Sequence, residues 1–271
     1  MPLTTTQRAQ FQRDGYLAFP DILTPAEVTA ARAALAKLVQ QNSRTPGRLG
    51  QLLVQFEPVV PAGTADELKV RKLMWFCAVN PFLDNLAHRH PKIRGIVESL
   101  IGDHPILFQE MALIKPPLIG SEKPWHQDNA YFAVTPLDAV IGVWIALDAA
   151  TVANGCMHVL VGEHKLGPRR HHHDRDCEIV PQRLDPSRAV PVELPAGGAM
   201  FFAGLLPHMT PPNQSLDRRR ALQFHYRSAT SQIVTKDAYD KVYAEPDGTP
   251  ASCAAAPSGR GTRAGLRSLR G

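Results

Sequence analysis

The feature that most constrains the fold of this chain is a run at residues 125–128, in which one residue separates His126 from Asp128. Side chains on a β-strand alternate between two faces, so an extended run directs these two side chains to the same side. A second histidine, His208, ends an apolar stretch at residues 201–208 that is typical of a buried strand followed by a turn. A closed or sandwiched sheet would bring the two segments face to face.

Two imidazoles and one carboxylate are the ligand set of non-haem Fe(II) oxygenases, in which three protein ligands occupy one face of the metal. The other face is left for a cosubstrate and dioxygen. Arg219, farther along the chain, can supply a cation for a carboxylate of that cosubstrate. The alternative for His126 and Asp128 is an ordinary polar pair at a strand edge.

The chain has 11 histidines, and others among them have weaker interpretations. A second His-x-Asp pattern, His172 and Asp174, lies in a polar run without strand alternation. That run predicts a solvated loop, or at most an adventitious metal trap. His88 and His90 precede Pro91, where the pattern indicates the end of a helix and helix-terminal roles.

Four segments carry a pattern that is specific when they are taken together. They are residues 122–132 around His126, residues 143–148 around Trp144, residues 154–165, and residues 208–221 beginning at His208. In order and spacing they resemble the phytanoyl-CoA dioxygenase family of Fe(II)- and 2-oxoglutarate-dependent oxygenases. The resemblance runs from about residue 10 to about residue 227.

The resemblance implies that His126, Asp128 and His208 bind iron, with Fe(II), the cosubstrate 2-oxoglutarate and O2 as cofactors. It also implies hydroxylation, because halogenating relatives replace the carboxylate of Asp128 with a small residue. Desaturation and ring formation stay open, since they depend on how the substrate is placed.

The resemblance further assigns Arg219 to the distal carboxylate of 2-oxoglutarate, because the family's arginine stands eleven positions after the distal histidine. A planar guanidinium suits this task, since it can bind a carboxylate through two parallel hydrogen bonds. Strand alternation places three further residues on the face of Arg219 and its two neighbouring arginines on the opposite, solvent-facing side. The residues on its face are Ala221, Gln223 and His225, and the neighbours are Arg218 and Arg220.

Four other residues match family positions near the cosubstrate. Lys115 and Met111 share one face of a strand expected at residues 108–116, and ordinary packing is the alternative for Met111. Trp144 matches a tryptophan beside the cosubstrate, and Lys72 matches a basic family position. Each of these two could instead be a core residue or a lysine that extends its charge to solvent.

Composition indicates one enzyme domain of 271 residues, with 44% hydrophobic and 20% charged residues. The four cysteines lack zinc-like or paired spacing, which favours reduced thiols in the cytoplasm. No stretch approaches a membrane span, and no signal core follows the N-terminus. The net charge is +5, but the basic residues are scattered, so no nucleic-acid partner is expected.

Periodicity predicts helices in the front half of the chain, at residues 24–38, 66–76 and 81–101, the last interrupted near Pro91. From residue 106 onward short strands follow, at residues 139–147, 191–194, 199–202 and 221–227. The predicted fold is mainly β, a cupin-like double-stranded β-helix (jelly roll) buttressed by helices. We expect a single domain at residues 1–243, with the jelly roll at about 104–230.

Residues 244–271 form a low-complexity tail that is expected to pack poorly, with arginines at Arg260, Arg263, Arg267 and Arg270. This tail, or the basic run near Arg169, could instead attract an anionic substrate.

The predicted function is hydroxylation of an unactivated carbon of a small-molecule metabolite, as in the tailoring steps of secondary metabolism. The alternatives are oxidation of an acyl group carried on CoA or a carrier protein, and a catalytically silent protein that only binds 2-oxoglutarate. Trp125, Tyr131 and Phe132 are candidates to line the substrate cavity, although alternation directs Trp125 away from the metal. The partner is a small molecule, and the sequence leaves monomer and homodimer open.

Overall fold

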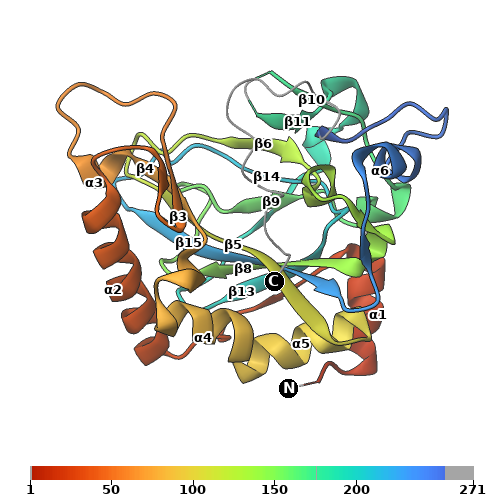
Figure 1. Ribbon diagram of the computed structural model, residues 1–271, viewed down its shortest axis with the longest axis horizontal. Helices are drawn as coiled ribbons and strands as arrows, with labels where there is room; N and C mark the ends of the chain where they lie inside the picture. Colours follow the sequence, from red (N-terminus) through yellow and green to blue (C-terminus); the bar gives the residue numbers. More distant parts are fainter. Residues whose placement is uncertain (1, 175, 254–271) are drawn as a thin grey trace.

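Antiparallel strands make two sheets that face each other across the core. The computed structural model describes residues 2–174 and 176–253 (Figure 1). The larger sheet, called the major sheet, has the strand order β1 (Tyr16–Phe19), β13 (Ala199–Ala203), β8 (Val140–Ala146), β15 (Arg219–Ser228), β5 (Pro105–Lys115), β4 (Val70–Met74), β3 (Leu52–Phe56) and β2 (Gly47–Leu49). The smaller one, called the minor sheet, has the order β12 (Val190–Val192), β9 (Met157–Val159), β14 (His208–Thr210) and β6 (Lys123–His126).

The face of the major sheet that is turned away from the minor sheet is covered by α1 (Thr5–Asp14), α2 (Pro25–Asn42), α4 (Pro81–Arg89) and α5 (Pro91–Ile101) (Figure 1). The short helix α3 (Asp66–Lys69) precedes β4, and α6 (Lys236–Val242) packs against β11. Two two-stranded sheets complete the described strands, the hairpin of β10 (His171–His173) with β11 (Cys177–Ile179) and the distant pair β7 (Val134–Thr135) with β16 (Gln232–Ile233). The short 3-10 helices are η1 (Phe76–Ala78), η2 (Asp128–Tyr131), η3 (Leu137–Ala139), η4 (Glu163–Leu166), η5 (Pro181–Arg183) and η6 (Pro186–Arg188).

Alternation along β8 and β15 divides the core into two layers. Val143 and Ile145 of β8 pack with the helices, whereas Trp144 and Ala146 face the minor sheet. Such strands are buried on both faces and read as continuous apolar runs. The mainly β jelly roll with buttressing helices is confirmed.

The helix starts that the sequence predicts at Thr24 and near Pro91 are present. Thr24 caps α2 through a reciprocal capping box with Glu27, and Pro25 stands at the first helical position. His90 ends α4 and caps α5, where its side chain accepts a hydrogen bond from the N–H of Ile93. A helix-terminal role for His90 is therefore confirmed.

The helix predicted at residues 66–76 is wrong, and so is a purely helical front half. Only α3 is helical there, and the chain then enters β4, where Val70 and Leu73 are fully buried. β4 pairs with β3 and β5, and β1 pairs with β13, far away in sequence. These pairings come from tertiary contacts that override local helical periodicity.

The polar run at residues 171–173 is a strand, not the solvated loop that its composition predicts. His171 is only 7% exposed, and its Nε2 accepts a hydrogen bond of 3.0 Å from the backbone N–H of Gln127. Burial lowers the pKa of His171 to about 4, so the ring is neutral and can accept this bond. One histidine of the run thus supports the segment that carries Asp128.

Cys177 of β11 and Cys253 form a disulfide across 76 residues, which corrects the prediction that all four cysteines are reduced thiols. The spacing of the cysteines in the sequence could not predict this bond, because Cys177 and Cys253 meet only when α6 and the residues that follow it pack against β11. Cys77 and Cys156 are free.

Residues 244–253, which composition assigns to the tail, pack in part against the domain, where Ala251 is fully buried. The four tail arginines lie outside the described residues, and the domain boundary stays a prediction. No helix within residues 2–174 and 176–253 is long and apolar enough to span a membrane.

Candidate metal centre

His126, Asp128 and His208 converge between the two sheets. β6 and β14 are antiparallel neighbours whose register sets His126 opposite His208, and the two ring centroids are 4.1 Å apart. Asp128 joins them, and one ligand atom from each of the three residues lies within 4.8 Å of the others. All three side chains are buried, at 5%, 3% and 2% exposure.

The prediction was right about the direction of Asp128 but wrong about its element. β6 ends at His126, and Asp128 is the first residue of η2. Gln127 is still extended, so alternation directs the side chains of His126 and Asp128 to the same side, and the chain turns only in η2. The side chain of Gln127 anchors this segment, since its Nε2 donates to the carbonyls of Gly167 and Leu205.

The two histidines present the same ring nitrogen to the cluster. Nδ1 of His126 donates to the carbonyl of Pro124 at 2.8 Å, and Nδ1 of His208 donates to the carbonyl of Leu206 at 2.9 Å. The lone pair of Nε2 is therefore free, 3.4 Å from Oδ1 of Asp128 for His126 and 3.7 Å for His208. Burial lowers the pKa of His126 to about 3 and also lowers that of His208, which favours the neutral, ligating form.

Asp128 is held through its other oxygen. Oδ2 accepts hydrogen bonds from Nε2 of His225 at 2.8 Å and from Nε2 of Gln223 at 3.3 Å. Burial opposes the ionised carboxyl, but the imidazoles of His225 and His208 outweigh burial and hold the pKa of Asp128 well below its usual range. Oδ1 is left facing the two imidazoles, as a single-oxygen ligand requires.

Arg219, at the start of β15, is a buried cation beside this cluster. It is 1% exposed, and its guanidinium lies 5.3 Å from the ring of Trp144. Its Nη1 donates to the carbonyl of Leu113 at 3.4 Å, while its Nε has no partner among the described residues. Burial lowers the pKa of Arg219 to about 10. A buried guanidinium without a carboxylate partner is costly, so the site fits an anionic ligand.

The other predicted cosubstrate residues lie on the same inner face of the major sheet. Lys115 stands opposite Arg219 in the register of β5 and β15, and Met111 stands opposite Gln223. Lys72, on β4, stands opposite Leu113. The structure therefore brings Lys115, Met111, Trp144 and Lys72 to one face, and their roles stay predictions.

The ammonium of Lys115 already has backbone partners. Its Nζ donates to the carbonyl of Ser121, and to that of Thr210 on β14 at 3.4 Å. Burial, together with Arg219, lowers the pKa of Lys115 to about 6. Burial likewise lowers the pKa of Lys72 to about 8. Both ammonium groups thus lose their proton more readily than that of an exposed lysine.

The sequence did not predict the polar contacts that Tyr131 makes with charged side chains. Tyr131 is 40% exposed, and its hydroxyl contacts Lys123 and Asp176, which form an ion pair of 2.7 Å. Phe132 packs against the ring of His225. Trp125 points away from the metal, as predicted, and lines an outer hollow of about 200 Å³ with Met209.

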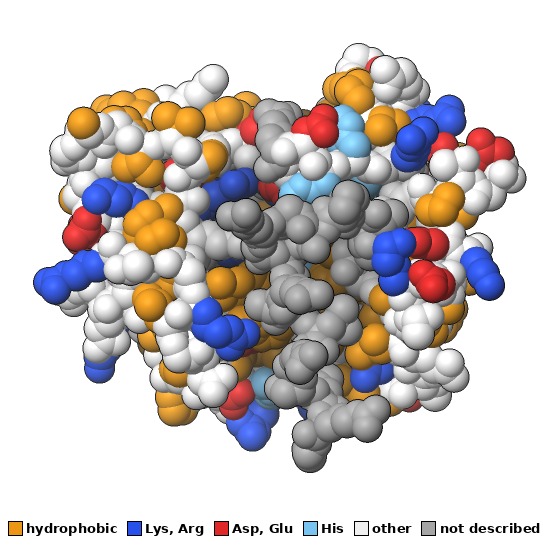
Figure 2. All heavy atoms as spheres, turned by 45° about the horizontal axis from the view of Figure 1, so that its top comes forward, with side chains coloured by type: hydrophobic (Ala, Val, Ile, Leu, Met, Phe, Trp, Pro, Cys, Tyr) orange, Lys and Arg blue, Asp and Glu red, His pale blue; other side chains and the backbone are white. Residues whose placement is uncertain are grey.

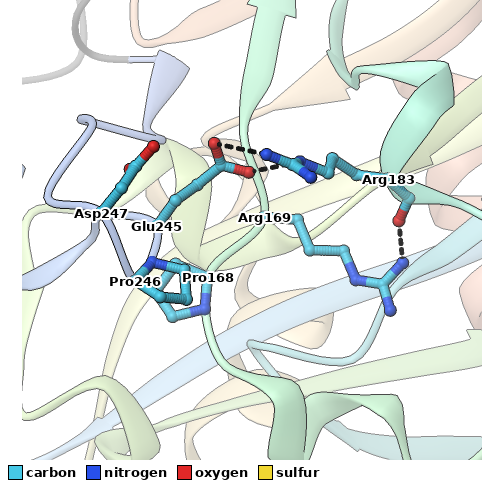
Figure 3. Close-up of a pocket in the computed structure, with 6 residues that line it drawn as sticks. All are labelled: Pro168, Arg169, Arg183, Glu245, Pro246 and Asp247. Atoms are coloured by element: carbon cyan, nitrogen blue, oxygen red, sulfur yellow. Dashed lines mark hydrogen bonds and ion pairs between the residues drawn. The ribbon is translucent and has the colours of Figure 1, made fainter.

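Arg169 and Arg183, near the basic run, have acidic partners. A hollow of about 410 Å³ lies there, lined by Pro168, Arg169, Arg183, Glu245, Pro246 and Asp247 (Figure 3). Arg183 pairs with Glu245 at 2.7 Å, and Arg169 pairs with Glu163. On the face shown in Figure 2, acidic and basic side chains are interspersed. The charges of Arg169 and Arg183 are therefore at least partly compensated.

Comparison with known proteins agrees with this geometry. The sequence model described as phytanoyl-CoA dioxygenase (PhyH) matches residues 11–221. Phytanoyl-CoA dioxygenase domain-containing protein 1 of Danio rerio is 25% identical over 272 residues, covering 86% of this chain and 93% of the relative.

Two solved structures are similar over most of their length. The non-haem α-ketoglutarate-dependent carbocyclase SnoK from nogalamycin biosynthesis is 25% identical, with a TM-score of 0.64, covering 85% of this chain and 86% of SnoK. The non-haem monooxygenase ThoJ is 27% identical, with a TM-score of 0.68, covering 84% of this chain and 79% of ThoJ. The chain belongs to the phytanoyl-CoA dioxygenase family and is a non-haem Fe(II)- and 2-oxoglutarate-dependent oxygenase.

Proposed function

We propose that the protein hydroxylates an unactivated carbon of a small-molecule metabolite and releases succinate and CO2. The observation that carries this proposal is the complete, buried cluster of His126, Asp128 and His208, with Arg219 unpaired beside it. Bound iron and 2-oxoglutarate supply the oxidising chemistry, and the protein supplies placement.

In this proposal each residue of the centre has one task. His126 and His208 bind iron through Nε2, because their Nδ1 atoms are committed to backbone carbonyls. Asp128 binds iron through Oδ1, because its Oδ2 is committed to His225 and Gln223. The occupied carboxylate position supports hydroxylation over halogenation.

Arg219 binds the distal carboxylate of 2-oxoglutarate and orients the cosubstrate toward the metal. The ring of Trp144 packs against the guanidinium, and Met111 lies on the same face of the major sheet. Lys115 borders the same face and holds β5 against β14 through the carbonyl of Thr210, and the charge of Lys72 adds to the attraction of an anionic cosubstrate.

The name of SnoK, from nogalamycin biosynthesis, supports a tailoring enzyme of secondary metabolism, and the name of ThoJ, a monooxygenase, supports hydroxylation. The alternative, an acyl group carried on CoA, is favoured by the names of relatives such as the peroxisomal phytanoyl-CoA dioxygenase of Mus musculus. CoA would need a basic entrance, and Arg169 is already paired with Glu163. The complete ligand cluster argues against a silent 2-oxoglutarate-binding protein.

The test is turnover under labelled O2 with two substrate panels, ring-bearing small metabolites and acyl-CoA thioesters. Hydroxylation of a small metabolite predicts one succinate per product and a product that gains one labelled oxygen atom. A product that loses two hydrogens without gaining oxygen would replace hydroxylation by desaturation. Turnover restricted to thioesters, and lost on charge reversal of Arg169 and Arg170, would favour the alternative.

We place the protein in the cytoplasm, as a monomer or homodimer, without nucleic-acid or membrane partners. A reducing cytosol would keep Cys177 and Cys253 as thiols, so the state of this pair in cells tests the location.

A further inference from the structure

A second group of metal-ligating side chains lies on the opposite, helical side of the major sheet. Cys77 belongs to η1, and Asp84 and His88 belong to α4, which lies beneath the sheet in Figure 1. One ligand atom from each of the three residues, sulfur, carboxylate oxygen and imidazole nitrogen, lies within 4.8 Å of the other two. None of them takes part in the iron centre.

Local backbone structure brings these three residues together. Asp84 and His88 are one turn apart on α4, with Nδ1 of His88 2.9 Å from Oδ1 of Asp84. Trp75 adopts a left-handed conformation, with φ of 67°, and so turns the chain out of β4 into η1. The N–H of Cys77 then donates to Oε1 of Glu110 at 3.1 Å, which fixes the start of η1 against β5.

Glu110 adds a buried acidic group behind the cluster. It is 6% exposed, and no lysine or arginine among the described residues forms an ion pair with it. Burial raises the pKa of Glu110. Burial, followed by the carboxylates of Glu110 and Asp84, also raises the pKa of the Cys77 thiol. Two carboxyl groups thus lie near the sulfur, Glu110 and Asp84, and Asp84 also pairs with His88 and Arg89. The carboxyl groups would stabilise a bound cation there.

We propose that Cys77, Asp84 and His88 form a second metal site that takes Zn²⁺ or another thiophilic divalent cation. Thiolate, imidazole and carboxylate are the ligands that zinc prefers in proteins, and water would complete a tetrahedral set. A bound cation also deprotonates a coordinating thiol, whatever its pKa in the metal-free protein. Glu110 stays behind the site and balances its charge. The site holds the start of α4 against η1.

The alternative to a metal site is that Asp84 and His88 form an ordinary ion pair on α4 and that Cys77 is a small side chain packed beside them. Neither explains why the three donor atoms converge beside a buried carboxylate that pairs with no lysine or arginine among the described residues. The side chains of His88 and Asp84 are 43% and 30% exposed, so an ion can reach the site from solvent.

The test is titration of the full-length chain with Co²⁺ while the near-ultraviolet thiolate-to-cobalt charge-transfer band is recorded. The iron centre contains no sulfur, so this band reports only the second site. The expected result is a band in the unaltered chain that is lost in Cys77→Ser and reduced in His88→Ala. It should persist in Cys156→Ser, which alters the other free thiol. Zn²⁺ should displace the band and raise the Tm of the unaltered chain more than that of Cys77→Ser, which retains only the iron centre.

A chain that binds cobalt at the iron centre but develops no thiolate band would overturn the proposal, as would a band that survives in Cys77→Ser. Circular dichroism of each variant establishes that it is folded. Asp128→Ala should retain the thiolate band, so failure of the second site and failure of the iron centre are distinguished.

Discussion

His225 donates a hydrogen bond of 2.8 Å from Nε2 to Oδ2 of Asp128, and this bond determines which oxygen of Asp128 faces the two histidines. His225 is 1% exposed and comes from β15, so a strand of the major sheet positions a carboxylate that belongs to η2. Groups that orient metal ligands in this way commonly change metal affinity when they are lost.

Replacing His225 by Phe should therefore weaken Fe(II) binding by about 10- to 100-fold, because Asp128 loses the partner that orients it. Calorimetric titration with Fe(II) under argon measures this affinity. Tyr226→Phe is the matched control, because Tyr226 lies on the other face of β15 and donates to the carbonyl of Ala87. Equal iron affinity of His225→Phe and the unaltered protein would show that Asp128 does not depend on this bond.

Arg219→Met should raise the KM for 2-oxoglutarate by about 30-fold or more, because the loss of a buried charged pair costs about 2 kcal/mol or more. Initial rates of succinate release at varied 2-oxoglutarate give this constant. Arg218→Ala, at the neighbouring position, should leave it unchanged. An unaltered KM in Arg219→Met would remove Arg219 from the cosubstrate site.

The pH dependence of stability should carry the signature of Lys115. Its pKa falls from 10.5 to about 6 on folding, so between these values the unfolded chain binds more protons than the folded chain. The free energy of unfolding therefore rises with pH through this window. Urea unfolding of the metal-free protein at several pH values should show this rise, and Lys115→Met should show a smaller one. Parallel pH profiles for the two proteins would contradict it.

The disulfide between Cys177 and Cys253 predicts how many thiols can be alkylated and how reduction changes the stability of the protein. Alkylation of the unfolded, unreduced protein should label Cys77 and Cys156 only. Reduction should lower the free energy of unfolding by up to about 4 kcal/mol, because the bond closes a long loop in the unfolded chain. Labelling of all four cysteines before reduction would mean that Cys177 and Cys253 are unpaired.

Local sequence could predict the elements whose signals are local. The capping box at Thr24 and the proline at position 91 define α2 and the boundary between α4 and α5. Alternation along β15 correctly predicted that Gln223 and His225 lie on the face of Arg219, but it could not predict their hydrogen-bond partner. The partner of these side chains is Asp128, about a hundred residues earlier in the chain. A local sequence pattern cannot predict a contact between residues so far apart in the chain.

What the sequence missed depends on contacts between distant segments. The segment from Val70 to Met74 has helical periodicity, but it forms a strand because it pairs with β3 and β5. The link between Cys177 and Cys253 forms only once α6 is packed. The segment that carries Asp128 is anchored by the amide of Gln127, whose partners lie in loops near Gly167 and Leu205.

The most direct test of the central claim is anaerobic titration of the metal-free protein with Fe(II) and then 2-oxoglutarate, recording the weak visible charge-transfer band of the iron chelate. The band should form in the unaltered protein, be absent in His126→Ala and be weakened in Arg219→Ala, while Arg218→Ala retains it. No band in the unaltered protein, or a full band in His126→Ala, would contradict the assignment of this centre.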